Sequence, residues 1–85
     1  MPQFIITKKA LKQIEKLDPQ VKNRILAKLT ELKAEDDYRS IEKIFGMNGA
    51  SHRLRVGDYR LILRQENEVD FFVISIGHRS SVYQK

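Results

Sequence analysis

The chain has 85 residues, a formal net charge of +5, a sequence pI of about 9.7 and no cysteine. This length accommodates one small domain, spanning residues 1–85, and the positive charge favours a polyanionic partner such as nucleic acid, an anionic surface or an acidic protein. The lack of cysteine excludes disulfides, thiolate nucleophiles and cysteine zinc sites and suits the cytoplasm, and the chain contains neither a membrane-length apolar run nor the apolar core of a signal peptide.

The first part of the chain predicts a short strand followed by two amphipathic helices. The strand covers residues 3–6, and Thr7 can cap the helix that follows it. Asp18 and Pro19 then provide an N-cap and a first helical residue for the second helix. Because so few residues separate the helices, we expect an antiparallel hairpin that packs its apolar side on a sheet. The apolar positions at helical spacing are Ala10, Leu11, Ile14 and Leu17 in the first helix and Val21, Ile25, Leu29 and Leu32 in the second.

A cluster of carboxylates follows the second helix, in the least periodic part of the chain. It contains Glu35, Asp36 and Asp37, and Glu42 lies a few residues further on. Acidic residues at a helix end are usually solvated, and nothing in the spacing directs these four toward one point. We therefore predict neither a metal site nor a pair of catalytic carboxylates here.

The next stretch carries the densest alternation of arginine with apolar residues. The alternation has a period of two, which predicts two strands with one apolar face and one largely cationic face. Gly57 can adopt the positive φ that a two-residue hairpin of type II′ requires at its first central position. We therefore expect the turn at Gly57 and Asp58. The resulting facing pairs are Val56 with Tyr59, Arg55 with Arg60, Leu54 with Leu61 and Arg53 with Ile62.

This register gathers arginines on one face of the sheet: Arg53, Arg55 and Arg60, with Arg64 further along. Like charges directly opposite each other destabilise a hairpin. Their retention on an otherwise well-patterned hairpin favours an anionic ligand, and phosphate suits arginine best.

Residues 69–77 form a nearly continuous β-branched and aromatic run, which is typical of a central strand. Together the elements predict an α+β fold. It consists of a small, mostly antiparallel sheet of about four strands, with the N-terminal helical hairpin packed on one face.

Three polar side chains follow the last strand, at a sheet end where reactive groups often lie: His78, Arg79 and Tyr83. The ordinary explanation of His78 and Tyr83 is a surface histidine and an aromatic that anchors the C-terminal tail. His52 is interpreted as a surface residue at a strand start. The two histidines lack a third ligand at a recognisable spacing, so we predict no zinc site and no cofactor.

The order of these elements resembles the RelE branch of the RelE/ParE superfamily of bacterial and archaeal toxins from type II toxin–antitoxin systems. The resemblance covers essentially the whole chain: a strand, two helices, an R-x-R strand, a G-D-Y-R hairpin, a hydrophobic strand ending in I-G-H-R and a terminal V-Y. It implies the order β-α-α-β-β-β and a ribosome-dependent endoribonuclease that cuts mRNA in the ribosomal A site without a metal. It also implies a cognate antitoxin that silences the toxin in a hetero-oligomer.

The resemblance also assigns a site. Arg53 and Arg55 fall where RelE-like toxins place two catalytic basic residues, which are often lysines, and Arg60 matches the arginine of the hairpin. Arg79 and Tyr83 match the arginine just past the last strand and the catalytic tyrosine near the C-terminus. Arginine is a poor base because its pKa exceeds about 12. The resemblance therefore implies Tyr83 as base, with Arg60 and Arg79 as phosphate clamps. His78 is a candidate acid for another reason, because histidine has the ordinary pKa best suited to proton transfer near neutral pH.

Two other functions stay open. A ParE-like toxin has the same fold but poisons DNA gyrase by protein–protein contact and requires no nuclease site. A non-catalytic RNA-binding or ribosome-binding module would use the same arginines without cleavage. The combination of the arginines with Tyr83 favours the RelE branch, because a ParE-like chain has less reason to keep a tyrosine after the last strand.

Overall fold

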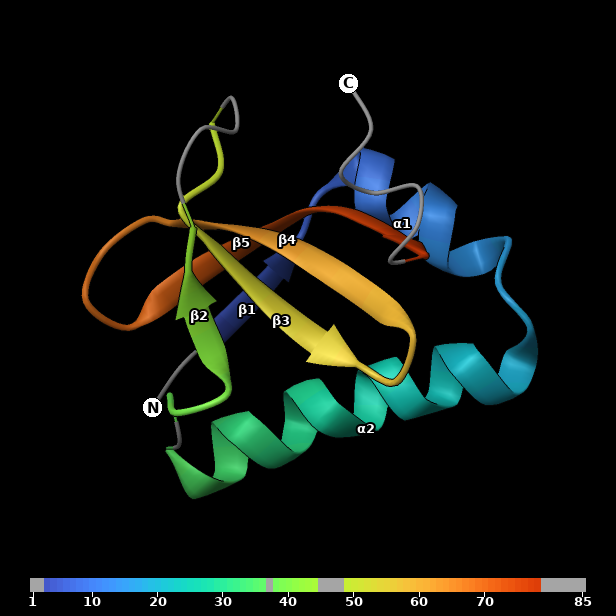
Figure 1. The fold of residues 1–85 in the computed structure, drawn as a ribbon, viewed down its shortest axis with the longest axis horizontal. Coiled ribbons are helices and arrows are strands. Elements are labelled where there is room, and N and C mark those ends of the chain that lie inside the picture. The colour runs from blue at the N-terminus through green and yellow to red at the C-terminus, as the bar shows by residue number, and fades with distance from the viewer. Residues whose placement is uncertain (1–2, 37, 45–48, 79–85) are drawn as a thin grey trace.

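The computed structural model describes residues 3–36, 38–44 and 49–78 (Figure 1). The elements follow in chain order as β1 (Gln3–Ile6), α1 (Lys8–Glu15), α2 (Pro19–Glu35), β2 (Ile41–Lys43), β3 (His52–Val56), β4 (Tyr59–Gln65) and β5 (Asp70–His78). Within this part of the chain, neither helix is long and apolar enough to cross a membrane.

The five strands form one sheet in the order β1-β5-β4-β3-β2. Three of the four neighbouring pairs are antiparallel, and β1 runs parallel to β5. The α+β class and the mostly antiparallel sheet are confirmed. The sheet has one strand more than the four expected, because β2 contains only three residues and is too short to produce an alternating pattern.

Both helices begin at the predicted caps. The Thr7 hydroxyl accepts a hydrogen bond from the Ala10 N–H at 3.3 Å and donates one to the Val73 carbonyl at 3.0 Å, which ties the start of α1 to β5. Asp18 accepts from the Gln20 N–H at 2.9 Å, with Pro19 at the first helical position of α2. Each cap satisfies an N–H group that has no partner within its own helix.

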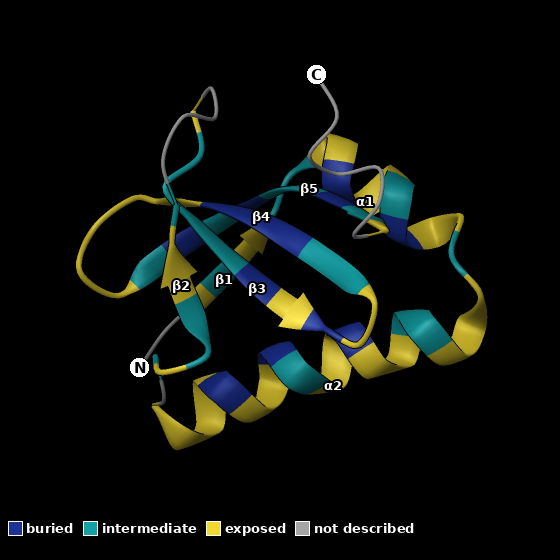
Figure 2. Ribbon diagram, in the orientation of Figure 1, coloured by how far each residue is buried: buried dark blue, intermediate teal, exposed yellow. Residues whose placement is uncertain are grey.

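The helices pack on the same face of the sheet, α1 chiefly beside β5 and α2 beside β3 (Figure 1). Burial is concentrated in the middle of β3, β4 and β5 and along one stripe of each helix (Figure 2). The core consists of Ala10, Ile14, Ile25, Leu29, Leu32, Leu54, Val56, Leu61, Leu63, Phe71, Val73 and Ile76.

One core prediction is wrong. Leu11 is 47% exposed, whereas Ala10 and Ile14 are buried. Successive residues are turned about 100° around a helix, so Leu11 points well away from the stripe that Ala10 and Ile14 share. A single leucine at this position is an ordinary surface residue.

An irregularity between β4 and β5 decides which side chains share a face. Ile62 pairs with Ser75 but Leu63 pairs with Val73, so Ile74 is the extra residue of β5. The shift keeps Val73 and Ile76 both in the core although they are three residues apart. It also sets Arg60 opposite Gly77.

Candidate functional site

The sheet face that points away from the helices carries Arg53, Arg55, Arg60 and Arg64, and we call it the arginine face. In β3, Leu54 and Val56 lie in the core beneath the helices, so the residues that alternate with them lie on the opposite side. In β4, Leu61 and Leu63 lie in the core in the same way. The face is built by strand alternation alone.

The β3–β4 hairpin has the predicted turn and register. Gly57 has a φ of +60°, while Asp58 does not have a positive φ, as a type II′ turn requires. The facing pairs are Val56 with Tyr59, Arg55 with Arg60, Leu54 with Leu61 and Arg53 with Ile62. The predicted gathering of Arg53, Arg55 and Arg60 on one face is therefore confirmed.

Glu42 of β2 lies among these arginines. It pairs with Arg53 across the β2–β3 ladder. One of its carboxylate oxygens, Oε1, accepts a hydrogen bond from the Arg53 Nε at 3.2 Å and forms an ion pair with the Arg55 Nε, also at 3.2 Å. A single carboxylate oxygen thus bridges two guanidinium groups. Glu42 is exposed, as expected of a solvated carboxylate, and the contacts with the two arginines add a role that its spacing does not indicate.

The arginines fix the charge state of this carboxylate. The hydrogen bond from Arg53 lowers the pKa of Glu42 below its ordinary value, and the charges of Arg53, Arg55 and Arg60 act in the same direction. Partial desolvation of Glu42 opposes them but does not prevail. Glu42 is therefore ionised at neutral pH and offsets part of the positive charge of the face.

Arg60 lies at the centre of the face, between Arg55 on β3 and Gly77 on β5. Its Nη1 donates to the Tyr59 carbonyl at 3.2 Å. Its Nε is buried, and among the described residues this nitrogen has no hydrogen-bond partner. Leaving a buried donor unpaired costs about 1–3 kcal/mol, and more for a charged group. A bound anion that accepts from this nitrogen would remove that cost.

Arg64 extends the face toward the other end of β4. Its guanidinium carbon lies 4.9 Å from the centre of the Phe72 ring, which faces it on β5. Ile5 of β1 pairs with Phe72 on the side away from Arg64 and is 44% exposed. A cation over an aromatic ring next to a cationic face combines the two features that bind a nucleic-acid strand, a partner for phosphate and a surface for bases.

The structure does not bring His78 together with the arginines. Gly77 pairs with Arg60, so the next residue turns to the other side of the sheet. There the His78 ring contacts the Tyr59 ring edge to face, with the centroids 5.6 Å apart. Tyr59 packs against the core under the helices. The candidate acid therefore lies across the sheet from the arginine face.

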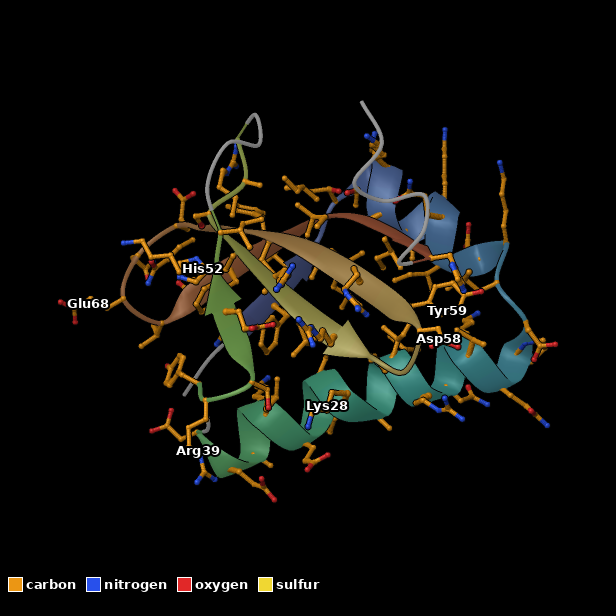
Figure 3. All side chains as sticks on the ribbon, viewed as in Figure 1. Lys28, Arg39, His52, Asp58, Tyr59 and Glu68 are labelled. Atoms are coloured by element: carbon orange, nitrogen blue, oxygen red, sulfur yellow. The ribbon has the colours of Figure 1, made fainter. Side chains whose placement is uncertain are left out.

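His52 also lies on the helix side, at the other end of the sheet from Tyr59 (Figure 3). Its ring meets Phe71 edge to face at 5.4 Å, and its Nδ1 lies 2.8 Å from the Ser51 hydroxyl. Partial burial lowers the pKa of His52, and the charge of Lys43, its pairing partner on β2, lowers it further. These contacts make His52 a packing residue at the strand start.

Arg79 and Tyr83, which the resemblance assigns to the site, lie outside the described residues. The three described arginines of that assignment come together with Glu42. Their assembly needs no residue beyond β2, β3 and β4.

A model of the ParE toxin of the type II toxin–antitoxin system parDE matches residues 4–83. The chain belongs to this ParE toxin family. It is thus a member of the RelE/ParE superfamily, as the sequence predicts. No curated protein matches this chain at a significant level.

Solved structures similar to this chain include RelE toxins, alone or bound to antitoxins. The isolated RelE toxin of E. coli is 31% identical, with 98% of this chain and 92% of that chain covered and a TM-score of 0.64. The intact E. coli RelBE complex gives 28% identity, coverage of 92% and 96%, and a TM-score of 0.66. The RelBE2 complex of Mycobacterium tuberculosis gives 21% identity, coverage of 93% and 100%, and a TM-score of 0.75, a likeness of fold.

The sequence pattern did not indicate that Glu42 belongs to the arginine face of this ParE-family protein. Its pattern gives little signal, because three residues of strand cannot establish a period. Glu42 reaches the arginines only through the pairing of β2 with β3, which joins segments that lie apart in the sequence.

Proposed function

We propose that this type II toxin is a ribosome-dependent endoribonuclease that cuts mRNA without a metal and thereby inhibits translation in the cytoplasm. The observation that carries the proposal is the pairing of Arg55 with Arg60 on the arginine face, where the Arg60 Nε is buried and has no hydrogen-bond partner within the described part of the chain. The likeness to E. coli RelE over nearly the whole chain supports the RelE-like activity.

The chemistry needs few groups. The 2′-oxygen of a ribose attacks the adjacent phosphorus, the bond from phosphorus to the 5′-oxygen breaks, and a 2′,3′-cyclic phosphate and a 5′-hydroxyl result. A base takes the proton of the 2′-hydroxyl, and an acid protonates the leaving 5′-oxygen. The extra negative charge on the phosphate oxygens is stabilised by forked guanidinium donors, each worth a few kcal/mol in a desolvated site.

The described arginines suit the role of phosphate clamp. Arg60 offers its buried Nε, which no described residue pairs with, and Arg55 faces Arg60 on the next strand. Glu42 holds Arg53 and Arg55 together by their Nε atoms, through one shared carboxylate oxygen. Glu42 thus orients the pair.

We place the removal of the 2′-hydroxyl proton near the C-terminus. We assign the base to Tyr83 and a further phosphate clamp to Arg79, in line with the RelE-like pattern of the sequence. We do not assign the acid to His78, because it packs on Tyr59 on the helix side of the sheet.

We propose a cognate antitoxin as the protein partner, in a hetero-oligomer. The E. coli and M. tuberculosis relatives form toxin–antitoxin complexes. Two surfaces suit an acidic, amphipathic antitoxin segment. One is the arginine face, and the other is a groove of about 220 Å³ between β1 and α2, whose lining combines apolar Phe4, Ile6 and Leu26 with the cation of Lys33. Leu26 is partly exposed there. Raising the salt concentration is expected to weaken the complex through the arginine face, because screening acts on exposed charges.

The experiment that tests the nuclease is in vitro translation with purified toxin, followed by primer extension on the mRNA. The wild type is compared with Tyr83→Phe, Arg79→Ala and Arg60→Ala. Cuts that require ribosomes and fade in all three variants support the proposal. Intact mRNA from a preparation that still arrests cells would overturn it.

The family model, which describes the ParE toxin of parDE, favours a second candidate function, inhibition of DNA gyrase. Such a toxin acts by protein–protein contact and needs no nuclease site. The two candidates differ in what an arrested cell shows first, DNA damage or a stop in protein synthesis. A gyrase supercoiling assay with the same preparation decides between them directly.

A further inference from the structure

A second cationic site lies where α2 meets the β3–β4 hairpin. A pocket of about 370 Å³ opens between them, and its charged lining consists of Arg24, Lys28 and Glu31 from α2 and Arg55 from β3. Three cations thus surround one space with a single carboxylate. Figure 3 shows Lys28 on the stretch of α2 that runs beneath β3.

Arg55 connects this pocket to the arginine face. The β2 strand pairs only with residues 52–54, so Arg55 and Val56 lie beyond its end, at the outer edge of β3. The Arg55 side chain is 55% exposed, and its Nε binds Glu42 on the arginine face. The same side chain lines the pocket beside α2. The positive charge therefore continues around the sheet edge.

The two cations of α2 are not neutralised by neighbours. Throughout residues 3–36, 38–44 and 49–78, neither the Arg24 nor the Lys28 side chain forms an ion pair or a hydrogen bond. They stand four residues apart, on one side of the helix, where like charges cost a few tenths of a kcal/mol. Glu31 lies one turn on from Lys28 without pairing to it. The helix thus keeps two uncompensated charges next to each other.

The turn of the hairpin is shaped to admit Arg24. A Cβ atom on Gly57 would lie 2.9 Å from the Arg24 Nη1, closer than real Cβ contacts allow. The guanidinium therefore rests directly over the glycine of the turn. The charged group therefore lies at the pocket that Arg55 also lines.

We propose that Arg24, Lys28 and Arg55 form a phosphate-binding subsite for an RNA backbone that continues off the arginine face. This inference rests on the proposed action on RNA, and it adds the path that the RNA backbone takes over the protein surface. The chemistry is that of a phosphodiester, and its source is either the mRNA or ribosomal RNA. Two guanidinium groups and one ammonium group around one space suit a phosphate. An RNA strand that crosses the arginine face from β4 to β3 would reach this pocket at the edge of the sheet.

The test compares two doubly substituted toxins of equal charge. Arg24→Gln with Lys28→Gln removes the subsite cations, and Lys22→Gln with Lys33→Gln removes two cations from the opposite flank of α2. Binding of a single-stranded RNA oligonucleotide and of ribosomes is measured by fluorescence anisotropy and sedimentation over a range of salt concentrations. Thermal melting shows whether each variant is folded.

The expected result is a weaker complex with the subsite variant for all oligonucleotide sequences. Its slope of log affinity against log salt should fall by about 1.4, at about 0.7 for each lost phosphate contact. The flank variant should bind as the wild type does. If the subsite variant binds the oligonucleotide more weakly, the phosphodiester comes from single-stranded RNA such as the mRNA. If only its binding to ribosomes is weaker, the phosphodiester comes from ribosomal RNA. Equal behaviour of the two variants with both ligands overturns the subsite.

The wild type is assayed for cleavage in parallel. If it does not cut mRNA but the subsite variant still loses affinity and slope, the proposed nuclease fails and the subsite stands. If it cuts and the two variants bind alike, the subsite fails and the nuclease stands.

Discussion

Arg55 and Arg60 face each other directly across the β3–β4 ladder. Facing Cβ atoms in such a pair are about 5 Å apart, and like charges there are destabilising. Glu42 offsets the repulsion through Arg55 and Arg53, but Arg60 receives no carboxylate among the described contacts and keeps a buried, unpaired Nε. The Arg55–Arg60 pair thus destabilises the hairpin, and a bound phosphate would remove this destabilisation.

The first prediction concerns Arg60. Arg60→Ala removes the donor at the centre of the face and should lower the rate of ribosome-dependent mRNA cleavage by about 100-fold, the usual effect of losing one charge-stabilising donor. Arg60→Lys should recover part of the rate, because it restores the charge without the fork. Primer extension over a time course measures both rates.

Lys9→Ala is the control for Arg60, since it removes one positive charge from the exposed side of α1. If Lys9→Ala lowered cleavage as much as Arg60→Ala, net charge alone would explain the effect and the clamp would have no support.

The second prediction concerns Glu42, which neutralises part of the face and orients two arginines. Glu42→Gln should strengthen RNA binding, because the face gains one net positive charge. The same change should slow cleavage at saturating ribosomes, because Arg53 and Arg55 lose the negative charge of their shared partner and are held less firmly. Glu68→Gln, in the exposed loop between β4 and β5, removes the same charge elsewhere (Figure 3). Weaker RNA binding by Glu42→Gln would contradict this account.

Local patterns predicted most of the framework. Thr7, Asp18 and Gly57 act as expected because caps and tight turns depend on a few consecutive residues. The facing of Arg55 and Arg60 follows from the turn, since a two-residue hairpin sets the register of both strands. The two-residue alternation of the strands and the residues of the turn were therefore sufficient to predict the arginine face.

What the sequence could not provide are contacts between distant segments. Glu42 joins the arginines only because β2 pairs with β3, and nothing within a three-residue strand predicts that pairing. The side on which His78 lies depends on the extra residue Ile74 in β5. One residue of shift moves a side chain to the other face of a sheet, so a position near a strand end cannot be inferred from spacing alone.

The third prediction follows from the side that His78 occupies. His78→Ala removes a ring that packs on Tyr59 on the helix side. Cleavage by this variant should stay within a few-fold of the wild type, with an unchanged dependence of rate on pH, since losing a general acid typically costs about 100-fold or more. A large loss of rate that left the melting temperature unchanged would return His78 to the site.

The fourth prediction concerns the turn. Gly57→Ala places a Cβ on a residue with a φ of +60° and should lower the free energy of unfolding by about 1–2 kcal/mol, the usual cost of a left-handed conformation. The Cβ would also meet the Arg24 Nη1, which is the end of a flexible side chain and can move aside. Urea unfolding of Gly57→Ala in the wild type and in Arg24→Ala separates the two effects. If Arg24→Ala abolished the loss, contact with Arg24 would be its cause.

The fifth prediction concerns stability in acid. Burial and the charge of Lys43 lower the pKa of His52, so the folded protein keeps this ring neutral at pH values where the unfolded chain, with a pKa of about 6.5, binds a proton. The contribution of His52 to stability is fully present above about pH 6.5 and is lost as the pH falls through the folded-state pKa. The melting temperature of His52→Phe should therefore fall less than that of the wild type when the pH is lowered from about 8 to about 5, an interval that includes the unfolded-state pKa. His78→Gln serves as the histidine control, and an equal loss in the His52 variant and the wild type would show that acidification acts through other groups.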